Sequence, residues 1–405
     1  MPVNTGRGGF LPLLTPRHPR EQSCVPLDTA ACETIGRRGR VDRQSEKGPR
    51  RFPADRVAEQ TEVVLKAWGL APDLAAVTTA AMIDTDLAGI DSHGISMLPT
   101  YEPGHGPTTI DFSARPAVTA RTGVTARVDG GGGLGHPCAV LAMRTAIEIA
   151  RESAVGVVAA HNSNHFGAVG HYAAMAAEAG LIGIVTTTAR SISVLPARGA
   201  VPRLGTNPLA FAAPTGNGRP FLLDMSTSTV AVNKVKVYDL NDRPVPPGWV
   251  LDGSGEPVTD AGEAMAYLRQ RPEGGITALG GTAEMSAHKG YGLAVMVQIL
   301  AGALTGATFP PLREPGAPDD IGHLFLVIDP AAVRGGDGFT ADVDVIVDTL
   351  HATPPADPEL PVLVAGEPED RTREERGRLG IPIPERLLDQ LRDLCERAGA
   401  PFLLG

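Results

Sequence analysis

Short runs of Val and Ile alternate with Ala-rich stretches from residue 126 onward, and this alternation constrains the fold more than any other feature. The strand-like runs are residues 126–128, 156–160, 182–187, 209–213, 221–224 and 324–328, and helix-like runs between the first three are residues 139–152 and 168–179. Strands that alternate with helices build an α/β domain around a sheet. The fold class predicted from the sequence is therefore α/β.

Helices are also predicted near both ends of the chain. Val57, Val64 and Trp68 recur at helical spacing, Pro53 suits a first turn, and Gly69 suits a helix end. Further helices are predicted at residues 73–87, 290–304 and 385–397. Because the last of these is amphipathic, we expect it to pack beside the N-terminal helices. Two stretches rich in Pro, Gly and charge, 241–275 and 309–321, are interpreted as surface excursions.

The charge pattern argues against a nucleic-acid partner. The formal net charge of the 405 residues is −10, and no basic stripe with interleaved aromatic residues is present. Residues 1–52 differ, with ten Lys/Arg against five Asp/Glu and no hydrophobic periodicity. We interpret this leader as a disordered extension or an over-long gene start. A basic arm that binds nucleic acid is the alternative.

Cysteine usage and hydropathy indicate the compartment. The four cysteines, Cys24, Cys32, Cys138 and Cys395, lie far apart without a C-x-x-C pair, so we interpret them as free thiols in a reducing compartment. No stretch approaches the roughly 18 apolar residues of a membrane helix, and none forms a signal-peptide core. We expect a cytoplasmic protein without a membrane partner.

Two glycine-flanked segments each carry a histidine. The first, residues 86–101, contains Ser92-His93-Gly94 just past a predicted helix end, and the second, residues 161–167, contains His165 between a predicted strand and a predicted helix. A histidine exchanges a proton near neutral pH, and a helix start attracts anions. Each histidine taken alone is also compatible with a structural role at a helix end. We leave His161 out of the site as structural.

A glycine run at residues 130–135 satisfies the G-x-G-x-x-G dinucleotide fingerprint and lies between a predicted strand and a predicted helix. The acidic residue that should follow the next strand is absent, because that strand ends at His161 and Asn162. We therefore interpret the run as a plain glycine turn.

Three polar clusters follow apolar runs, at residues 204–208, 223–228 and 288–292. Small and hydrogen-bonding residues in such positions can bind a flat polar cofactor through backbone groups. Singly, each cluster is also compatible with a turn or a helix cap, and Lys289 with an ordinary solvated lysine. A phosphate or carboxylate partner is the functional interpretation of Lys289.

Six of these segments occur in an order that resembles a known family. They are Ser92-His93-Gly94, Asn164-His165-Phe166-Gly167, the Leu-Gly-Thr-Asn-Pro of 204–208, the Asp-Met-x-x-Ser of 224–228, the Lys-Gly-Tyr-Gly-Leu of 289–293, and Gly366-Glu367-Pro368. This order resembles the malate/L-lactate dehydrogenase family that is unrelated to the Rossmann-fold lactate and malate dehydrogenases. The similarity runs from Phe52 to Phe402. Related members include ureidoglycolate, sulfolactate and diketogulonate dehydrogenases and an imine reductase.

The resemblance implies a non-Rossmann nicotinamide-binding fold and usually a homodimer. The implied fold has a central domain around a mixed sheet, at residues 116–330. Residues 53–115 and 331–405 together form a helical subdomain from both chain ends. The implied cofactor is NAD or NADP, and the sequence does not decide between them.

The resemblance also assigns roles residue by residue. His165 and His93 fall on positions that act as proton donor or acceptor in different members, with His165 our choice for the acid/base. Tyr101, Asn207 and position 97 fall on the substrate side. The cofactor-binding positions are Thr188, Ala189, Asp224, Met225, Ser226, Thr227, Ser228, Lys289, Gly366, Glu367 and Pro368.

Two departures from the family pattern concern substrate binding. Many members have an arginine where this chain has Met97, and a thioether cannot replace the bidentate grip of a guanidinium on a carboxylate. The usual Thr-Asn-Ala/Ser is here Thr187-Thr188-Ala189. We infer that substrate specificity has drifted.

The predicted chemistry is hydride transfer between a small 2-hydroxy or 2-oxo acid and a nicotinamide, with a histidine exchanging the hydroxyl proton. Reduction of a cyclic imine or another 2-oxo analogue is the alternative within the family. A metal-dependent lyase or hydrolase with His93, His165 and Asp91 as ligands is a rival from another class, although no H-E-x-x-H spacing supports it. A catalytically inactive relative that only binds ligands is the third possibility.

Overall fold

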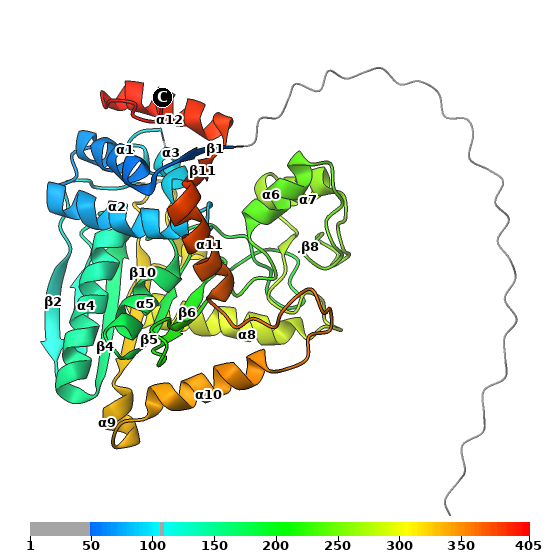
Figure 1. Ribbon diagram of the computed structural model, residues 1–405. Coiled ribbons are helices and arrows are strands. Elements are labelled where there is room, and N and C mark those ends of the chain that lie inside the picture. Colours follow the sequence, from blue (N-terminus) through cyan, green and yellow to red (C-terminus); the bar gives the residue numbers. More distant parts are fainter. Residues whose placement is uncertain (1–48, 106–108) are drawn as a thin grey trace, which may run out of the picture. The chain divides into compact units, whose positions relative to one another are not determined.

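A mixed sheet of seven strands forms the centre of the described residues, which are 49–105 and 109–405 of this computed structural model (Figure 1). In spatial order the strands are β2 (Ala117–Thr122), β3 (Thr125–Asp129), β4 (Val155–Ser163), β10 (Ile321–Ile328), β5 (Ile182–Thr187), β6 (Leu209–Ala213) and β7 (Phe221–Met225). β3 and β4 pair in parallel, and the other neighbours pair antiparallel. The predicted α/β class with a mixed central sheet is confirmed.

The position of β10 determines where the strands end. β10 lies between β4 and β5 and is antiparallel to both, so the carboxyl ends of β4 and β5 share one edge of the sheet. β3 and β7 end at the same edge, whereas β6 and β10 begin there. We call it the carboxyl edge. In open α/β sheets, ligands bind in the crevice outside such strand ends.

Helices cover both faces of the sheet. The predicted helices α4 (Gly135–Ser153) and α5 (Val169–Glu178) lie on one face, around a core that includes Val158, Val185 and Phe325. On the other face lies the π-helical segment Gln298–Ala303, which continues α8 (Ala287–Val297) and contacts β5 and β10. Close packing requires glycine here: a Cβ on Gly322 would lie 1.8 Å from the carbonyl oxygen of Ala301.

Both chain ends contribute to one helical cluster (Figure 1). Its helices are α1 (Ala54–Ala67), α2 (Pro72–Leu87), α3 (Leu98–Tyr101) and α12 (Glu385–Ala398), and β1 (Arg50–Phe52) pairs with β11 (Ile381–Ile383) beside them. Val57 and Val64 of α1 share this apolar cluster with Leu391 and Leu394 of α12, which confirms the predicted packing of the last helix. The domain boundaries at residues 115 and 330 stay a prediction.

The region 241–275 differs from the surface excursion predicted for it. It contains β8 (Val250–Leu251), α7 (Ala261–Arg269) and the start of β9 (Gly275–Ile276), and with α6 (Val232–Leu240) it encloses a small apolar cluster around Val235, Val250 and Ile276. Strands of two residues are too short to show a periodicity in the sequence. The excursion 309–321 contains a 3₁₀ turn at Pro310–Leu312.

Three helices follow the sheet that the sequence analysis did not predict. They are α9 (Pro330–Arg334), α10 (Phe339–His351) and α11 (Glu367–Leu379). α11 has no fully buried residue, so it has little of the apolar periodicity that reveals a helix. Within the described residues, no helix is long and apolar enough to cross a membrane. Residues 1–48 of the predicted leader, with Cys24 and Cys32, lie outside the described residues.

We predict that truncating Leu391 to Ala destabilises the protein by about 3 kcal/mol, because the side chain is fully buried between α12 and the N-terminal helices. Leu379→Ala is the matched control, since Leu379 on α11 is 49% exposed. Urea unfolding of both variants checks this. Equal loss of unfolding free energy in the two variants would contradict the packing described.

Candidate active site

The two predicted histidines meet outside the carboxyl edge. His93 follows α2, and His165 follows β4. Their rings stack with centroids 5.4 Å apart and planes inclined by 27°. Two segments that are distant in sequence thus place two imidazole rings against each other.

Tyr101 completes this group through a hydrogen bond to His165. Its hydroxyl lies 2.6 Å from Nδ1 of His165, and the backbone N–H of Gly167 donates to the same atom over 3.3 Å. Tyr101 is only 1% exposed, because α3 packs into the N-terminal apolar cluster. The hydroxyl that the family resemblance assigned to the substrate therefore bonds to a histidine.

Burial determines the charge of these side chains. It lowers the pKa of His93, and it lowers that of His165 well below the ordinary value, with further contributions from His93 and His136. Burial also raises the pKa of Tyr101. At neutral pH both rings are therefore neutral and the phenol keeps its proton.

The loop that carries His93 rests on a buried carboxylate. Asp86 in α2 accepts the backbone N–H of Ile95 at 2.8 Å, and a Cβ on Gly94 would lie 1.8 Å from Oδ1 of Asp86. Burial raises the pKa of Asp86 to about 7, helped by the charge of Asp91 and opposed by Arg376. Gly94 is thus required by the close approach of the loop to Asp86.

Asp91 points to an arginine and not to a metal site with the histidines. Its carboxylate bonds to Arg376, whose guanidinium also donates to the backbone oxygen of Asp86 at 2.7 Å. Across residues 49–105 and 109–405, no group of three or more His, Cys, Asp or Glu side chains is placed to hold a metal ion. The geometry therefore gives the metal-dependent rival no ligand set.

The glycine run 130–135 packs against the His165 segment. Gly130 and Gly132 donate their N–H groups to the backbone oxygens of His161 and Asn162, at 3.0 and 2.8 Å. A Cβ on Gly135 would lie 2.1 Å from the backbone oxygen of Asn164. These glycines permit contact between two protein segments, in agreement with their interpretation as a plain turn.

Thr188, Ala189 and Asn207 meet beside the ends of β5 and β10. The N–H of Thr188 donates to Gly322 O at 3.1 Å, and that of Ala189 to Asn207 Oδ1 at 3.4 Å. Asn207 is fully buried, and its Nδ2 donates to Ala294 O of α8 at 3.0 Å. Asn207 therefore connects the end of β5 to α8 with its own amide, which the expected substrate-side role does not explain.

The side chains of the run Asp224–Ser228 form hydrogen bonds with other parts of the protein. Asp224 accepts the N–H of Gly170 at 2.7 Å, so it caps the first turn of α5, and burial raises the pKa of its carboxyl to about 6. Thr227 donates its hydroxyl to Thr206 O and Asn207 O, both at 3.0 Å, and Ser228 donates to Val230 O at 2.8 Å. These three side chains serve the protein's own hydrogen bonds, as the capping alternative anticipated for Asp224. Met225 and Ser226 are partly buried beside them.

Lys289 lies in the first turn of α8 and is exposed. The helix start is joined to the Asp224–Ser228 run through Leu279, whose N–H donates to Thr227 O at 2.9 Å and against which Gly290 packs. Lys289 is thus an exposed cation at the N-terminal end of a helix, where backbone N–H groups attract anions.

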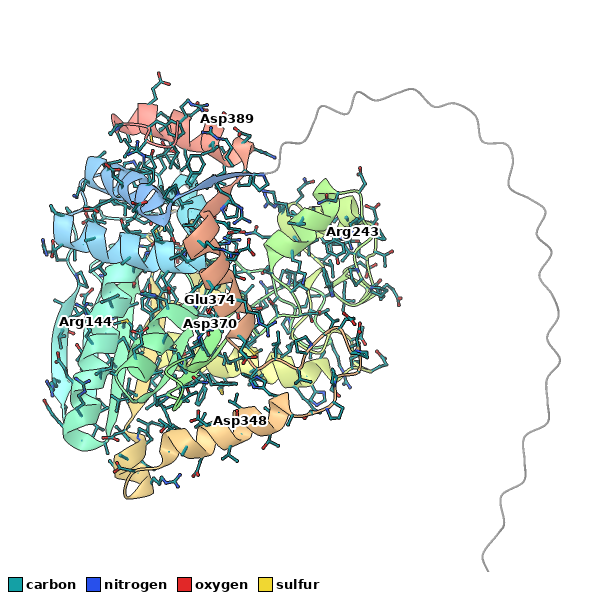
Figure 2. The ribbon with its side chains drawn as sticks, viewed as in Figure 1. Arg144, Arg243, Asp348, Asp370, Glu374 and Asp389 are labelled. Atoms are coloured by element: carbon teal, nitrogen blue, oxygen red, sulfur yellow. The ribbon has the colours of Figure 1, made fainter. Side chains whose placement is uncertain are left out.

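Gly366, Glu367 and Pro368 lie away from the carboxyl edge. Gly366 precedes α11 with φ 98° and packs on Leu222 of β7, about three residues or ~10 Å along the strand from its carboxyl end. Glu367 accepts the N–H of Val364 at 3.0 Å. Beside this turn lies a pocket of about 220 Å³, whose lining includes Asp370. Asp370 lies on α11 and is labelled in Figure 2. Of the three residues of the turn, Glu367 lines this pocket.

Comparison with known proteins identifies the family. The malate/L-lactate dehydrogenase model matches residues 52–392. The malate dehydrogenase of Pyrococcus horikoshii is 34% identical over 358 residues, covering 87% of this chain and 97% of that relative. The chain belongs to the malate/L-lactate dehydrogenase family. The predicted family, and the prediction of an enzyme that oxidises CH–OH groups, are confirmed.

Solved structures of the family share the fold. Malate dehydrogenase from Entamoeba histolytica matches with a TM-score of 0.80 at 28% identity, covering 87% of this chain and 99% of that chain. A Δ1-piperideine-2-carboxylate reductase from Pseudomonas syringae matches with a TM-score of 0.73 at 27% identity, over 85% of this chain and 99% of that chain. The family fold therefore accommodates proteins named for different substrates.

Two further histidines of this family member were missed by the sequence analysis. His136 is fully buried at the start of α4, neither of its ring nitrogens has a partner among the described residues, and its ring meets that of Tyr101 at 5.9 Å. His323 in β10 bonds to Thr187 Oγ1 at 2.7 Å and Ser163 Oγ at 3.0 Å. Burial lowers the pKa of each to about 3. The signal for His136 was its position between Gly135 and Pro137, which repeats the glycine-flanked pattern.

Met97 packs against the N-terminal apolar cluster and is partly buried. Its thioether cannot pair with an anion. At the position where many family members have a guanidinium, this chain therefore has an apolar side chain packed on the N-terminal cluster.

We predict that Asp86→Asn removes a pH dependence of stability. With a pKa of about 7 when folded and 3.8 as its ordinary value, Asp86 binds a proton more tightly in the folded state, so stability falls as pH rises between these values. The wild type should lose about 3 kcal/mol between pH 5 and pH 8 relative to this variant.

Urea unfolding at both pH values measures this difference. Asp389→Asn on α12 (Figure 2) is the control, because Asp389 is exposed. Its replacement should change the free energy of unfolding by the same amount at both pH values. If the difference in unfolding free energy between the wild type and Asp86→Asn is the same at pH 5 and at pH 8, Asp86 does not titrate in this range.

Proposed function

We propose that this protein transfers a hydride between NAD or NADP and a small 2-hydroxy or 2-oxo acid, with one histidine of the His93–His165 pair exchanging the proton. The observation that carries the proposal is the stacked pair itself, with ring centroids 5.4 Å apart. Burial keeps both rings neutral, so each offers one donor and one acceptor nitrogen. Oxidation of a hydroxy acid requires such an acceptor for the hydroxyl proton.

The residues at the carboxyl edge fit a nicotinamide cofactor by their chemistry. Thr188, Ala189 and Ser226 lie just past strand ends, with the N–H groups of Thr188 and Ala189 bonded within the protein. Lys289 carries a cation at a helix start. Neutral polar groups beside strand ends, together with one ammonium group at a helix start, suit a flat polar molecule that carries phosphate. When bound, the nicotinamide would supply or accept the hydride. The neighbouring hydrogen bonds of Asn207 and Thr227 would keep these segments in position.

The substrate class rests on the names of the relatives. One is named for malate and one for a cyclic imine carboxylate. Both compounds carry a carboxylate beside the carbon that changes oxidation state, so we propose a substrate with that arrangement. Reduction of a cyclic imine is the second candidate function, favoured by Met97, because an apolar residue suits the hydrocarbon part of a ring better than a second carboxylate.

We further propose a cytoplasmic homodimer that binds neither nucleic acid nor membranes. The compartment is supported by Cys138 and Cys395, which are buried free thiols. Light scattering of the purified protein at several concentrations tests the dimer, and a constant monomer mass would exclude it.

We predict that His165→Ala reduces turnover by at least about 100-fold and leaves NADH binding near normal, because the side chain acts on the substrate oxygen. His161→Ala is the control in the same segment, since His161 bonds to the backbone oxygen of Val128. Fluorescence titration with NADH and NADPH is followed by a screen of 2-oxo acids and cyclic imines. Full turnover in His165→Ala, or no binding of either nucleotide to the wild type, would refute the proposed function.

A further inference from the structure

The hydrogen bonds to His165 are compatible with only one neutral tautomer of its ring. A backbone N–H only donates, so the bond from Gly167 requires Nδ1 of His165 to accept. The buried hydroxyl of Tyr101 bonds to the same nitrogen at 2.6 Å, and a buried phenol hydrogen needs an acceptor. Both donors therefore point at Nδ1. In the neutral ring the hydrogen resides on Nε2.

The same surroundings oppose proton exchange by His165. If Nε2 lost its hydrogen, the ring would become an anion, or it would take the proton of Tyr101 and leave a buried tyrosinate. Burial raises the pKa of Tyr101, so the second route is unfavourable. Burial and the neighbouring rings of His93, His136 and His323 lower the pKa of His165, so a cationic ring is unfavourable too. His165 can donate a hydrogen bond but resists any change of charge.

His93 has more freedom than His165. Its Nδ1 lies 2.7 Å from the hydroxyl of Ser92, which can rotate to donate or to accept. Either tautomer of His93 is thus compatible with its neighbour. A group that gives and takes protons needs this freedom.

We propose that Tyr101 and Gly167 hold His165 as its Nε2–H tautomer, a fixed hydrogen-bond donor to the substrate oxygen, and that His93 exchanges the proton. The inference rests on the proposed function for its substrate. It reverses the roles expected from the sequence, and it makes Tyr101 a positioning residue. A neutral histidine that donates to a carbonyl oxygen is an established form of electrophilic catalysis.

On oxidation, a bound nicotinamide would accept the hydride from the substrate carbon, and the hydroxyl proton passes to a ring nitrogen of neutral His93, which becomes cationic. The new carbonyl oxygen accepts the N–H of His165. On reduction, His93 first takes up a proton from water, the carbon would receive the hydride from the bound nicotinamide, and the oxygen receives the proton from cationic His93, which returns to its neutral form. His165 keeps its hydrogen throughout.

The charged and titratable groups around the pair are few. His165 faces His93, Tyr101, His136 and His323, and the loop of His93 rests on Asp86, with Asp91 and Arg376 beyond it. His136 and His323 stay neutral in the neutral range, because burial lowers the pKa of each to about 3. An ionisation near pH 7 that depends on Asp86 is identified by the Asp86→Asn variant.

Nitrogen NMR of protein labelled at histidine tests the tautomer without turnover, so its failure is distinct from failure of the proposed function. The His165 signals are assigned with His165→Gln. We expect Nδ1 of His165 to resonate as an unprotonated nitrogen and Nε2 as a protonated one from pH 6 to pH 8. In Tyr101→Phe, loss of one donor should populate the other tautomer and raise the pKa of His165. A protonated Nδ1 in the wild type would overturn the proposal.

Kinetics of glutamine variants tests the division of roles. The side-chain amide of glutamine can donate a hydrogen bond in place of Nε2–H, but it cannot exchange a proton. We expect His165→Gln to keep turnover within about tenfold, the size of one impaired hydrogen bond, and His93→Gln to lose at least about 100-fold. The opposite order would overturn the assignment.

Tyr101→Phe should lower kcat about tenfold at nearly constant KM and shift the acid limb of the pH profile. Tyr172→Phe is the matched control, because that buried hydroxyl donates to Phe166 O and not to His165. If both variants change the NMR signals and the pH profile alike, Tyr101 has only a structural role.

Discussion

The antiparallel insertion of β10 between β4 and β5 is the constraint on which the rest of the structure depends. It places the carboxyl ends of β4 and β5 at one edge and separates them by the width of one strand. His165 then follows β4, and Thr188 follows β5, at the same edge. His323 of β10 bonds to both neighbouring strands through Ser163 and Thr187, and its ring stacks on Phe166 at 4.4 Å. Side chains from three neighbouring strands therefore support the segment that carries His165.

Burial of neutral polar groups gives this site its chemistry. Coulombic attraction between buried charges offers strong binding but is offset by the loss of hydration, whereas neutral imidazole and phenol groups can be buried with hydrogen bonds at lower cost. Tyr101 is fully buried and His93 and His165 are partly buried, and burial favours the neutral form of all three. The charges near the pair, on Asp86, Asp91 and Arg376, lie behind the loop of His93 and bond to the protein itself.

The sequence predicts the regular elements well and the site in part. Strands that contain Val and Ile, such as β4 and β5, and helices with clear periodicity, such as α1 and α12, agree with prediction to within a few residues, because burial of one face imposes a repeat. The two-residue strands β8 and β9 and the polar helix α11 leave no such repeat. The meeting of His93 with His165 was expected only from the order of motifs, since no local pattern shows that a loop after α2 reaches a loop after β4.

Hydrogen-bond partners are the part that the sequence does not predict. Asp224 and Asn207 were expected to face ligands. In the structure, Asp224 accepts a hydrogen bond from Gly170, and Asn207 donates one to Ala294 O. A polar residue at a strand end has the same sequence signature in either role, and only the approach of a second segment decides between them. The same applies to Tyr101, whose hydroxyl bonds to His165 because α3 is packed into the N-terminal cluster.

Transfer of deuterium from NADH or NADPH labelled at C4 tests the central claim most directly. The labelled nucleotide is incubated with the protein and the 2-oxo acid or cyclic imine that it reduces, and the product is examined by mass spectrometry. The account predicts one deuterium on the carbon that was the carbonyl or imine carbon, delivered from one face of the nicotinamide only. A product that carries no deuterium from the nucleotide, but takes it up at that carbon from heavy water, would contradict the account.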